Sequence, residues 1–189
     1  MPRLAGAHQA ANAALAVAML RHQNAIEVPS ASLRAAMGWA EWPARLQKLT
    51  SGPLPALLPA GSELWLDGGH NPAAGRAIAD FFRARLAPGR PFHLILGMLA
   101  NKDLRGFLEP FAGSGVHIVA VPVPGHEHHD AAAVRAAAES LDLTAGAAPD
   151  APAALEAIAT GAAAAPLVLV GGSLYLAGTV LAANGTPPD

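Results

Sequence analysis

From residue 63 onward the chain alternates short apolar runs with longer segments of helical character, and this alternation constrains the fold most. The apolar runs are 63–67 (ELWLD), 91–97 (PFHLILG), 115–123 (GVHIVAVPV) and 166–172 (PLVLVGG). The segments between and after them, 71–86, 101–111, 130–141 and 150–162, each open with Asn or Asp, which often cap helix N-termini. Apolar strands that alternate with helices are typical of a parallel sheet covered on both faces. We therefore predict a Rossmann-like three-layer α/β/α domain with a mostly parallel sheet and a weak further strand near 141–148.

The first 62 residues follow a different pattern. Residues 8–23 are rich in alanine and contain no helix breaker, which predicts a helix. A second short helix is predicted with Ser30 as its N-cap and Gly38 at its end. The segment 39–62 contains four prolines and is expected to be mostly loop, with a short strand at 45–49. On composition alone, this segment is the candidate domain boundary.

Composition and charge exclude several classes of protein. The chain has 189 residues, of which 52% are hydrophobic and 14% charged, as expected for one globular domain and not for a disordered or fibrous chain. Its net charge of -2 gives no basic surface for nucleic acid. It has no cysteine, no apolar run of the ~18–20 residues that a membrane span needs, and no signal-peptide pattern. We therefore expect a cytoplasmic protein with neither nucleic acid nor membrane as a partner.

Polar residues follow three predicted strands, at the edge where such sheets bind ligands. The start of a helix explains the turn conformation of residues 68–72 (GGHNP), but it does not explain the choice of Asp67 and His70 as side chains. A carboxylate at this place can accept from ribose hydroxyls, and an imidazole can donate to a carboxylate or phosphate. Lys102 faces the same edge, although a solvated first helical turn also explains it. Ser173 after two glycines fits an anion-binding turn or a plain N-cap equally well. Without a GxSxG elbow, a serine nucleophile is disfavoured.

The run His126-Glu127-His128-His129-Asp130 suggests a metal site at first sight. It is not an HExxH motif, adjacent histidines point apart on any regular element, and no complementary ligand spacing occurs elsewhere. We interpret the run as a solvated loop in which Asp130 caps the next helix, and we predict no metal site.

Five segments also resemble a known family. They are GAHQAANAALA at 6–16, WPARLQ at 42–47, LDGGHNP at 66–72, GMLANKD at 97–103 and VGGSLYLAG at 170–178. In this order they resemble the folylpolyglutamate synthase/dihydrofolate synthase family of the Mur ligase superfamily. Three positions depart from the family pattern: Gly69 stands in place of alanine, and Ala44 and Leu46 differ within its WPGRFQ-like segment. The spacer between Arg45 and Asp67 is also long and proline-rich, which suggests an inserted loop.

The resemblance implies an ATP-dependent ligase that forms an acyl phosphate on a carboxylate and joins it to the amino group of L-glutamate. It implies nucleotide contacts for Asn12, Arg45, Asp67 and His70, and glutamate contacts for His70 and Ser173, with Lys102 as a further candidate. ATP and Mg²⁺ are the implied cofactors. The chain has no GxxxxGK[ST] loop to cradle phosphates, so the resemblance places that loop and the magnesium ligands in an N-terminal ATPase domain.

By the same resemblance, residues 1–27 correspond to the terminal helix of that ATPase domain and a linker, and residues 28–189 to a C-terminal Rossmann-like ligase domain. The expected partners are the ATPase domain of the same protein, ATP, L-glutamate, and dihydropteroate or folate. We expect a monomer, no catalytic residue within this chain, and no ligase activity from the chain alone. Two alternatives stay open: the C-terminal domain of another Mur-type amide ligase, and a Rossmann-like binding module without enzymatic activity.

Overall fold

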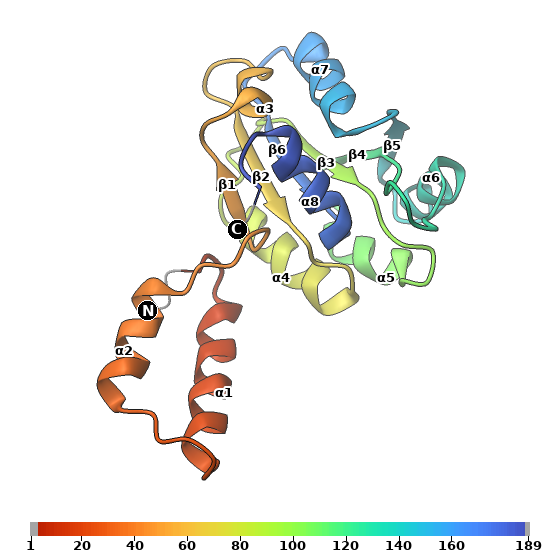
Figure 1. Ribbon diagram of the computed structural model, residues 1–189. Helices are drawn as coiled ribbons and strands as arrows, with labels where there is room; N and C mark the ends of the chain where they lie inside the picture. The colour runs from red at the N-terminus through yellow and green to blue at the C-terminus, as the bar shows by residue number, and fades with distance from the viewer. Residues whose placement is uncertain (1–3, 188–189) are drawn as a thin grey trace.

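The computed structural model describes residues 4–187 and shows a sheet domain from which two N-terminal helices project (Figure 1). The strands are β1 (Gln47–Leu49), β2 (Glu63–Asp67), β3 (Phe92–Leu96), β4 (His117–Ala120), β5 (Thr144–Ala147) and β6 (Leu167–Gly171). The helices are α1 (His8–His22), α2 (Ser30–Trp39), α3 (Pro53–Ala56), α4 (Pro72–Arg83), α5 (Leu104–Leu108), α6 (Ala131–Glu139), α7 (Ala151–Gly161) and α8 (Leu174–Ala183), with a 3₁₀ turn, η1, at Glu109–Phe111. The predicted alternation of strand and helix is confirmed, and so is the weak strand, as β5.

The six strands form one sheet in the order β1-β2-β6-β3-β4-β5. β1 pairs antiparallel with β2, whereas the other neighbouring strands run parallel. Asp67 at the end of β2 and Leu96 at the end of β3 both lie opposite Gly171 of β6. These three strands therefore end level, and the loops that follow them share one edge of the sheet.

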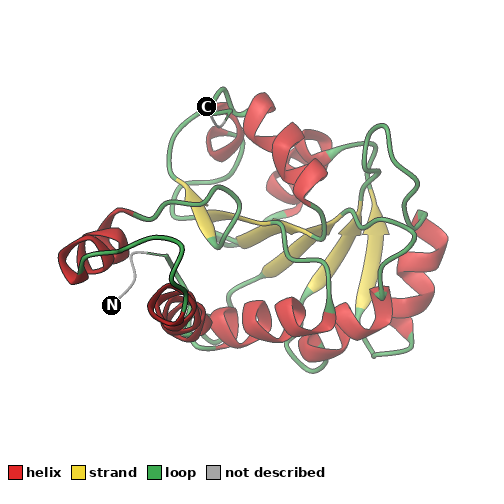
Figure 2. Ribbon diagram, turned by 60° about the horizontal axis from the view of Figure 1, so that its bottom comes forward, coloured by secondary structure: helices red, strands yellow, loops and turns green. Residues whose placement is uncertain are grey.

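Helices cover both faces of the sheet, as Figure 2 shows. Alternate strand residues point to opposite faces, so Leu94 and Ile118 pack with residues of α4, α5 and α6, whereas Ile95 and Val168 pack with residues of α3, α7 and α8. The predicted three-layer α/β/α architecture is thus confirmed.

The chain order creates a crevice at one place along this edge. From β2 to β5 the chain advances through α4, α5 and α6 on one face, and it returns through α7 on the other face to insert β6 between β2 and β3. α4 and α5, which follow β2 and β3, therefore lie on one face of the sheet, whereas α8, which follows β6, lies on the other face. Ligands in open α/β sheets bind in such a crevice beyond the carboxyl ends of the strands.

Three of the four predicted capping residues, Asn71, Asp130 and Asp150, cap their helices, and Asp103 takes the place of the predicted Asn101. The side chains of Asn71, Asp103, Asp130 and Asp150 each accept a hydrogen bond from a backbone amide in the first turn of α4, α5, α6 and α7. In the segment 101–111 the helix begins after Asp103 rather than after the first residue, Asn101. Lys102 therefore precedes α5 and does not lie in its first turn.

The N-terminal part differs from the prediction in detail. Pro29, not Ser30, occupies the N-cap position of α2, and no side chain caps that helix. The helix also continues through Gly38 to Trp39, since an interior glycine costs only about 1 kcal/mol relative to alanine. The expected strand is confirmed as β1, but the proline-rich loop also contains α3, which Pro53 starts from a position where no amide donor is needed.

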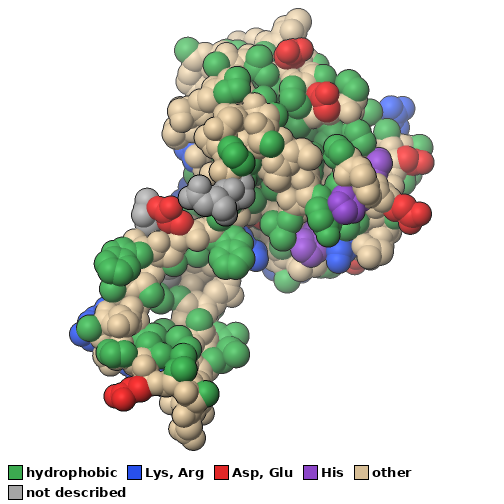
Figure 3. Space-filling model, viewed as in Figure 1, with side chains coloured by type: hydrophobic (Ala, Val, Ile, Leu, Met, Phe, Trp, Pro, Cys, Tyr) green, Lys and Arg blue, Asp and Glu red, His purple; other side chains and the backbone are tan. Residues whose placement is uncertain are grey.

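α1 and α2 lie on the same side of the sheet domain in Figures 1 and 2, and Figure 3 shows hydrophobic side chains on their surface. Leu15 is 62% exposed, Met19 65% and Trp39 77%. The domain boundary predicted after residue 27 stays a prediction. None of the helices within residues 4–187 has the length and apolar character that a membrane crossing requires.

Candidate functional site

A pocket of about 370 Å³ opens at the carboxyl ends of β2, β3 and β6. Its lining brings together three side chains that the sequence singled out, His70, Lys102 and Ser173, one from the loop after each strand. The other lining residues are Leu99, Gly172, Leu174 and Tyr175. We call this the edge pocket; it occupies the crevice that the strand order creates.

His70 lies in the turn between β2 and α4, where its ring is partly buried. Its Nδ1 is 2.9 Å from the carbonyl oxygen of Gly68. A carbonyl only accepts, so Nδ1 carries the proton, and Nε2 is the ring nitrogen left to bind a ligand.

Ser173 occupies the N-cap of α8 and is only 3% exposed. Its Oγ accepts from the backbone amide of Tyr175 at 3.1 Å, which confirms the N-cap interpretation and leaves the hydroxyl proton to donate. Gly172 makes the turn before it with φ of +98°, and a Cβ there would lie 2.6 Å from Leu96 Cδ1 and 2.8 Å from the carbonyl oxygen of Gly97. Only glycine fits at that position, and it lets the helix start close to the strand end.

Lys102 is partly buried in the loop between β3 and α5. Its backbone amide donates to the Leu99 carbonyl at 3.0 Å, and its carbonyl lies 2.9 Å from His129 Nε2. The loop is thus fixed through its backbone, while the ammonium group supplies positive charge to the edge pocket.

Asp67 is 4% exposed, and both its carboxylate oxygens accept backbone amides, from Leu46 at 2.8 Å and from Gly69 at 2.7 Å. Burial raises the pKa of Asp67 above its ordinary value, although the two amides and the charges of Arg45 and His8 act in the opposite direction. The carboxylate therefore ties the segment before β1 to the turn after β2. Its contact with a ribose stays a prediction.

Arg45 and Asn12 lie outside the edge pocket. Arg45 is exposed between two residues in the left-handed conformation, Ala44 (φ 56°) and Leu46 (φ 44°), and lines a second hollow of about 420 Å³ with Trp42, which is 63% exposed. Asn12 is exposed on α1, and its Nδ2 donates to Gln9 Oε1 at 3.2 Å. Asp67 thus connects the segment of Arg45 with the turn that carries His70, whereas Asn12 lies apart on α1.

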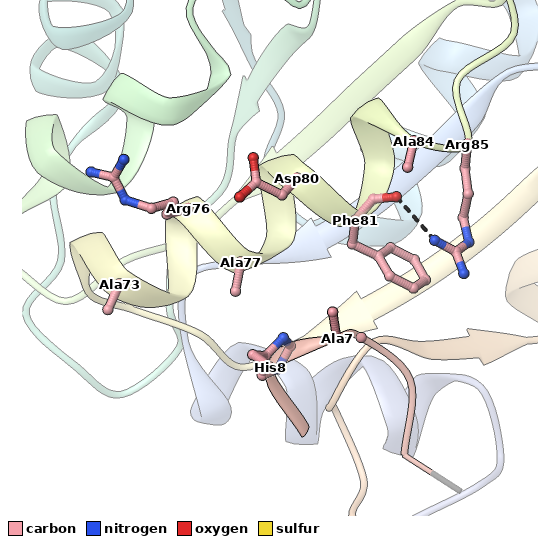
Figure 4. Close-up of a pocket in the computed structure, with 10 residues that line it drawn as sticks. Ala7, His8, Ala73, Arg76, Ala77, Asp80, Phe81, Ala84 and Arg85 are labelled. Atoms are coloured by element: carbon pink, nitrogen blue, oxygen red, sulfur yellow. Dashed lines mark hydrogen bonds between the residues drawn. The ribbon is translucent and has the colours of Figure 1, made fainter. Parts of the chain in front are cut away.

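A third hollow, of about 520 Å³, lies between the start of α1 and the outer side of α4 (Figure 4). The guanidinium of Arg85 lies 3.6 Å from the centre of the Phe81 ring and donates to the Phe81 carbonyl at 3.2 Å. Ala7, just before α1, Ala73 and Ala77 in α4, and Ala84 at its C-terminal end form much of the remaining wall. This hollow is away from the strand ends, so we favour the edge pocket as the functional site.

The run 126–130 forms a loop after β4, and Asp130 caps α6 as predicted, accepting from the amide of Ala133 at 2.7 Å. Within residues 4–187, no group of three or more His, Cys, Asp or Glu side chains is arranged to hold a metal ion.

Sequence reasoning missed Leu99 and Tyr175 as pocket residues and Trp42 beside Arg45. Tyr175 carried a usable signal, because an aromatic residue two positions after an N-cap lies in the first turn of the helix. Leu99 and Trp42 lie in the segments GMLANKD and WPARLQ that carry the resemblance, but as isolated apolar residues in loops they gave no chemical reason to be chosen.

Comparisons with known proteins identify the family and the fold of this chain. The family described as "Mur ligase, glutamate ligase domain" matches residues 58–174. The folylpolyglutamate synthase of Lacticaseibacillus casei is 28% identical over 125 residues, which are 65% of this chain and 27% of that protein. The folylpolyglutamate synthase of Mycobacterium tuberculosis complexed with ADP has the same fold, with a TM-score of 0.79, 23% identity, and coverage of 100% of this chain and 42% of that one. A bifunctional folylpolyglutamate synthase/dihydrofolate synthase with Mn, AMPPNP and L-glutamate bound has a TM-score of 0.72 and 25% identity over 92% of this chain and 39% of that one.

Proposed function

The chain belongs to the Mur ligase family of glutamate ligase domains, and from this we propose that it is the C-terminal domain of an ATP-dependent folate–glutamate ligase. It spans 27% of the curated relative and about two-fifths of the solved ones, 42% and 39%. The activity, the substrates and the partners of the complete protein are therefore part of the proposal.

The meeting of His70, Lys102 and Ser173 in the edge pocket carries the proposal. An ammonium group and a hydroxyl at the start of a ten-residue helix suit a carboxylate, because the free amides of the first helical turn also favour negative charge. His70, with its proton on Nδ1, can accept from the amino group of the same ligand through Nε2. The bifunctional synthase that was solved with L-glutamate bound supports glutamate as the ligand. We propose that the edge pocket binds the incoming L-glutamate.

The proposed reaction has two steps. A carboxylate oxygen of dihydropteroate or folate attacks the γ-phosphorus of ATP, and ADP leaves with the formation of an acyl phosphate. The amino group of glutamate then attacks the acyl carbon, inorganic phosphate leaves, and an amide forms. This chain contributes binding and orientation, which hold the amine close to the acyl carbon. Mg²⁺ would neutralise charge on the transferring phosphate, and we propose that its ligands lie in the ATPase domain.

We propose that α1 belongs to this ATPase domain, as the resemblance implies, and that the remainder of the domain packs against α1 and α2. Their exposed apolar side chains, Leu15, Met19 and Trp39, are of the kind that a neighbouring domain covers. Asn12, Arg45, Asp67 and His70 are the proposed nucleotide contacts, with Arg45 and Trp42 lining one hollow beside this helical pair. A cytoplasmic location and a monomeric enzyme complete the proposal.

The test measures phosphate release from ATP by the complete protein, with dihydropteroate or folate as the acceptor. Release should require glutamate, and Ser173→Ala should raise the KM for glutamate about tenfold or more, because the hydroxyl bonds a charged group. Ser140→Ala is the matched control, since Ser140 Oγ is exposed and donates only to the carbonyl of Ala137. Activity with a different carboxylate acceptor only would indicate another Mur-type ligase. An absence of glutamate-dependent release would indicate a binding module.

A further inference from the structure

The histidine run that follows β4 touches both sides of the edge pocket. Histidine side chains lie on the sheet domain in Figure 3, away from the two projecting helices. The sequence alone assigned the run no role beyond the cap at Asp130. The structure shows instead that residues 126–129 contact the loop after β3 and the start of α8, which supply two walls of the pocket.

The first contact is a short antiparallel pairing with the loop after β3. Leu99 and His128 form an isolated β-bridge. The amide of Ala100 donates to the Glu127 carbonyl at 3.1 Å, and the amide of His129 donates to the Met98 carbonyl at 2.9 Å. This pairing fixes the backbone on which Leu99 and Lys102 stand.

His129 adds a side-chain bond to the same loop. Its Nε2 lies 2.9 Å from the carbonyl oxygen of Lys102, so the ring nitrogen donates and the carbonyl accepts. The bond restrains the backbone of Lys102, which lines the pocket. His129 thus acts on Lys102 without touching a ligand itself.

His126 contacts the opposite wall. Its ring stacks on the ring of Tyr175, with the centroids 3.7 Å apart and the planes inclined by 29°. Tyr175 is 54% exposed, so few other contacts restrain its ring. The carbonyl of His126 in turn accepts from His128 Nδ1 at 2.8 Å, which shapes the loop that carries the stacked ring.

We propose that His126 and His129 are positioning residues of the edge pocket: His126 holds Tyr175 and His129 holds the Lys102 loop, so that together they set the affinity for the acidic amino acid. This inference rests on the proposed function, since it assigns the pocket to glutamate. It gives His126 and His129 a role that the prediction of a solvated loop did not include.

The experiment uses the complete ligase and measures kcat and the KM values for glutamate and ATP. His126→Ala should raise the KM for glutamate about threefold to tenfold, the range expected for the loss of one aromatic stacking pair, with kcat and the KM for ATP nearly unchanged. His126→Phe keeps a ring that can stack and should restore the wild-type KM. His129→Ala should also raise the KM for glutamate, whereas His129→Gln retains an amide donor and should raise it less.

His117→Gln is the control, because His117 lies at the opposite end of the sheet, where its Nδ1 contacts Thr144 Oγ1 at 2.8 Å. Thermal unfolding of each variant identifies a loss of folding. The inference is overturned if His126→Ala leaves the KM for glutamate unchanged, if the KM for ATP rises equally, or if His126→Phe fails to restore the wild-type value. A wild-type ligase without glutamate-dependent phosphate release would instead overturn the proposed function, and this inference with it.

Discussion

Replacement of Glu63 by Gln should destabilise the sheet domain in a pH-dependent way. Glu63 begins β2 at the edge opposite to the pocket, and its carboxylate accepts from Lys48 Nζ at 2.9 Å, from Arg90 Nη1 at 2.7 Å and from Trp65 Nε1 at 3.1 Å. Arg90 also donates to the carbonyls of Gly61 at 3.1 Å and Ala165 at 3.3 Å. One carboxylate thus joins β1, β2 and the loops that lead into β3 and β6.

The magnitude follows from the pKa of this carboxyl. Its hydrogen bond to Lys48, followed by those to Arg90 and Trp65, lowers the pKa of Glu63 from 4.5 to about 2 despite partial burial. That lowering corresponds to roughly 3 kcal/mol of preference for the charged form in the folded chain. The side chain of Lys48 is 42% exposed and that of Glu63 26%, so solvent screening reduces the expected loss in Glu63→Gln to about 1–2 kcal/mol at pH 7.

Urea denaturation of wild type and Glu63→Gln between pH 7 and pH 3 measures this difference. Since the folded pKa lies below the unfolded one, the stabilisation is complete above about pH 4.5 and is lost as the pH falls toward 2. The difference between the two proteins should therefore shrink across that window, because a protonated Glu resembles Gln.

Asp80→Asn provides the matched control. Asp80 pairs with Arg83 on α4, but the two side chains are 61% and 57% exposed, so this variant should change stability by less than about 0.5 kcal/mol. A difference for Glu63→Gln that stays constant from pH 7 to pH 3, or one no larger than that of the control, would refute the reasoning.

Three further predictions concern other parts of the fold. Gly75→Ala should lower stability by about 2 kcal/mol in thermal unfolding, because the added Cβ would clash with the Phe107 carbonyl where α4 meets α5. Gly178→Ala is the control: a Cβ at Gly178 meets no other atom, so this variant should be neutral or slightly stabilising. Asp67→Asn should cost about 1–3 kcal/mol and speed hydrogen exchange at the amides of Leu46 and Gly69, since an amide can accept only through its single oxygen; unchanged exchange would contradict this. Burial, followed by the charge of the neighbouring His117, lowers the pKa of His93, so the stability of the fold should decline as the pH falls below about 6.5. His93→Gln should lessen that decline, which urea denaturation midpoints at about pH 7.5 and 5.5 would measure.

The sheet domain could be predicted because its signals are local. The apolar runs marked β2, β3, β4 and β6, and the residues Asn71, Asp130 and Asp150 marked the starts of three helices, since a cap and its helix adjoin in sequence. The strand order could not be read in the same way. The insertion of β6 between β2 and β3 depends on contacts between segments about 100 residues apart.

The candidate site was predictable to the same extent. His70, Lys102 and Ser173 stood out because each follows a strand, and the sheet brings them together. The role of His126 could not be found from sequence, because its stacking partner, Tyr175, is distant along the chain. Asp67 was noticed for its position, but its two bonds to backbone amides depend on how Leu46 approaches the turn, which no sequence pattern reveals.

The bond between Asp67 and Leu46 also has a mechanical consequence. It anchors the connection to α1 and α2 in the turn that carries His70, three residues further along, and the amide of Gly68 reinforces the anchor by donating to the Ala44 carbonyl at 2.8 Å. The left-handed conformations of Ala44 and Leu46 leave this connection little freedom to bend. A rotation of α1 and α2 relative to the sheet would therefore displace the turn that carries His70, because these hydrogen bonds join the two.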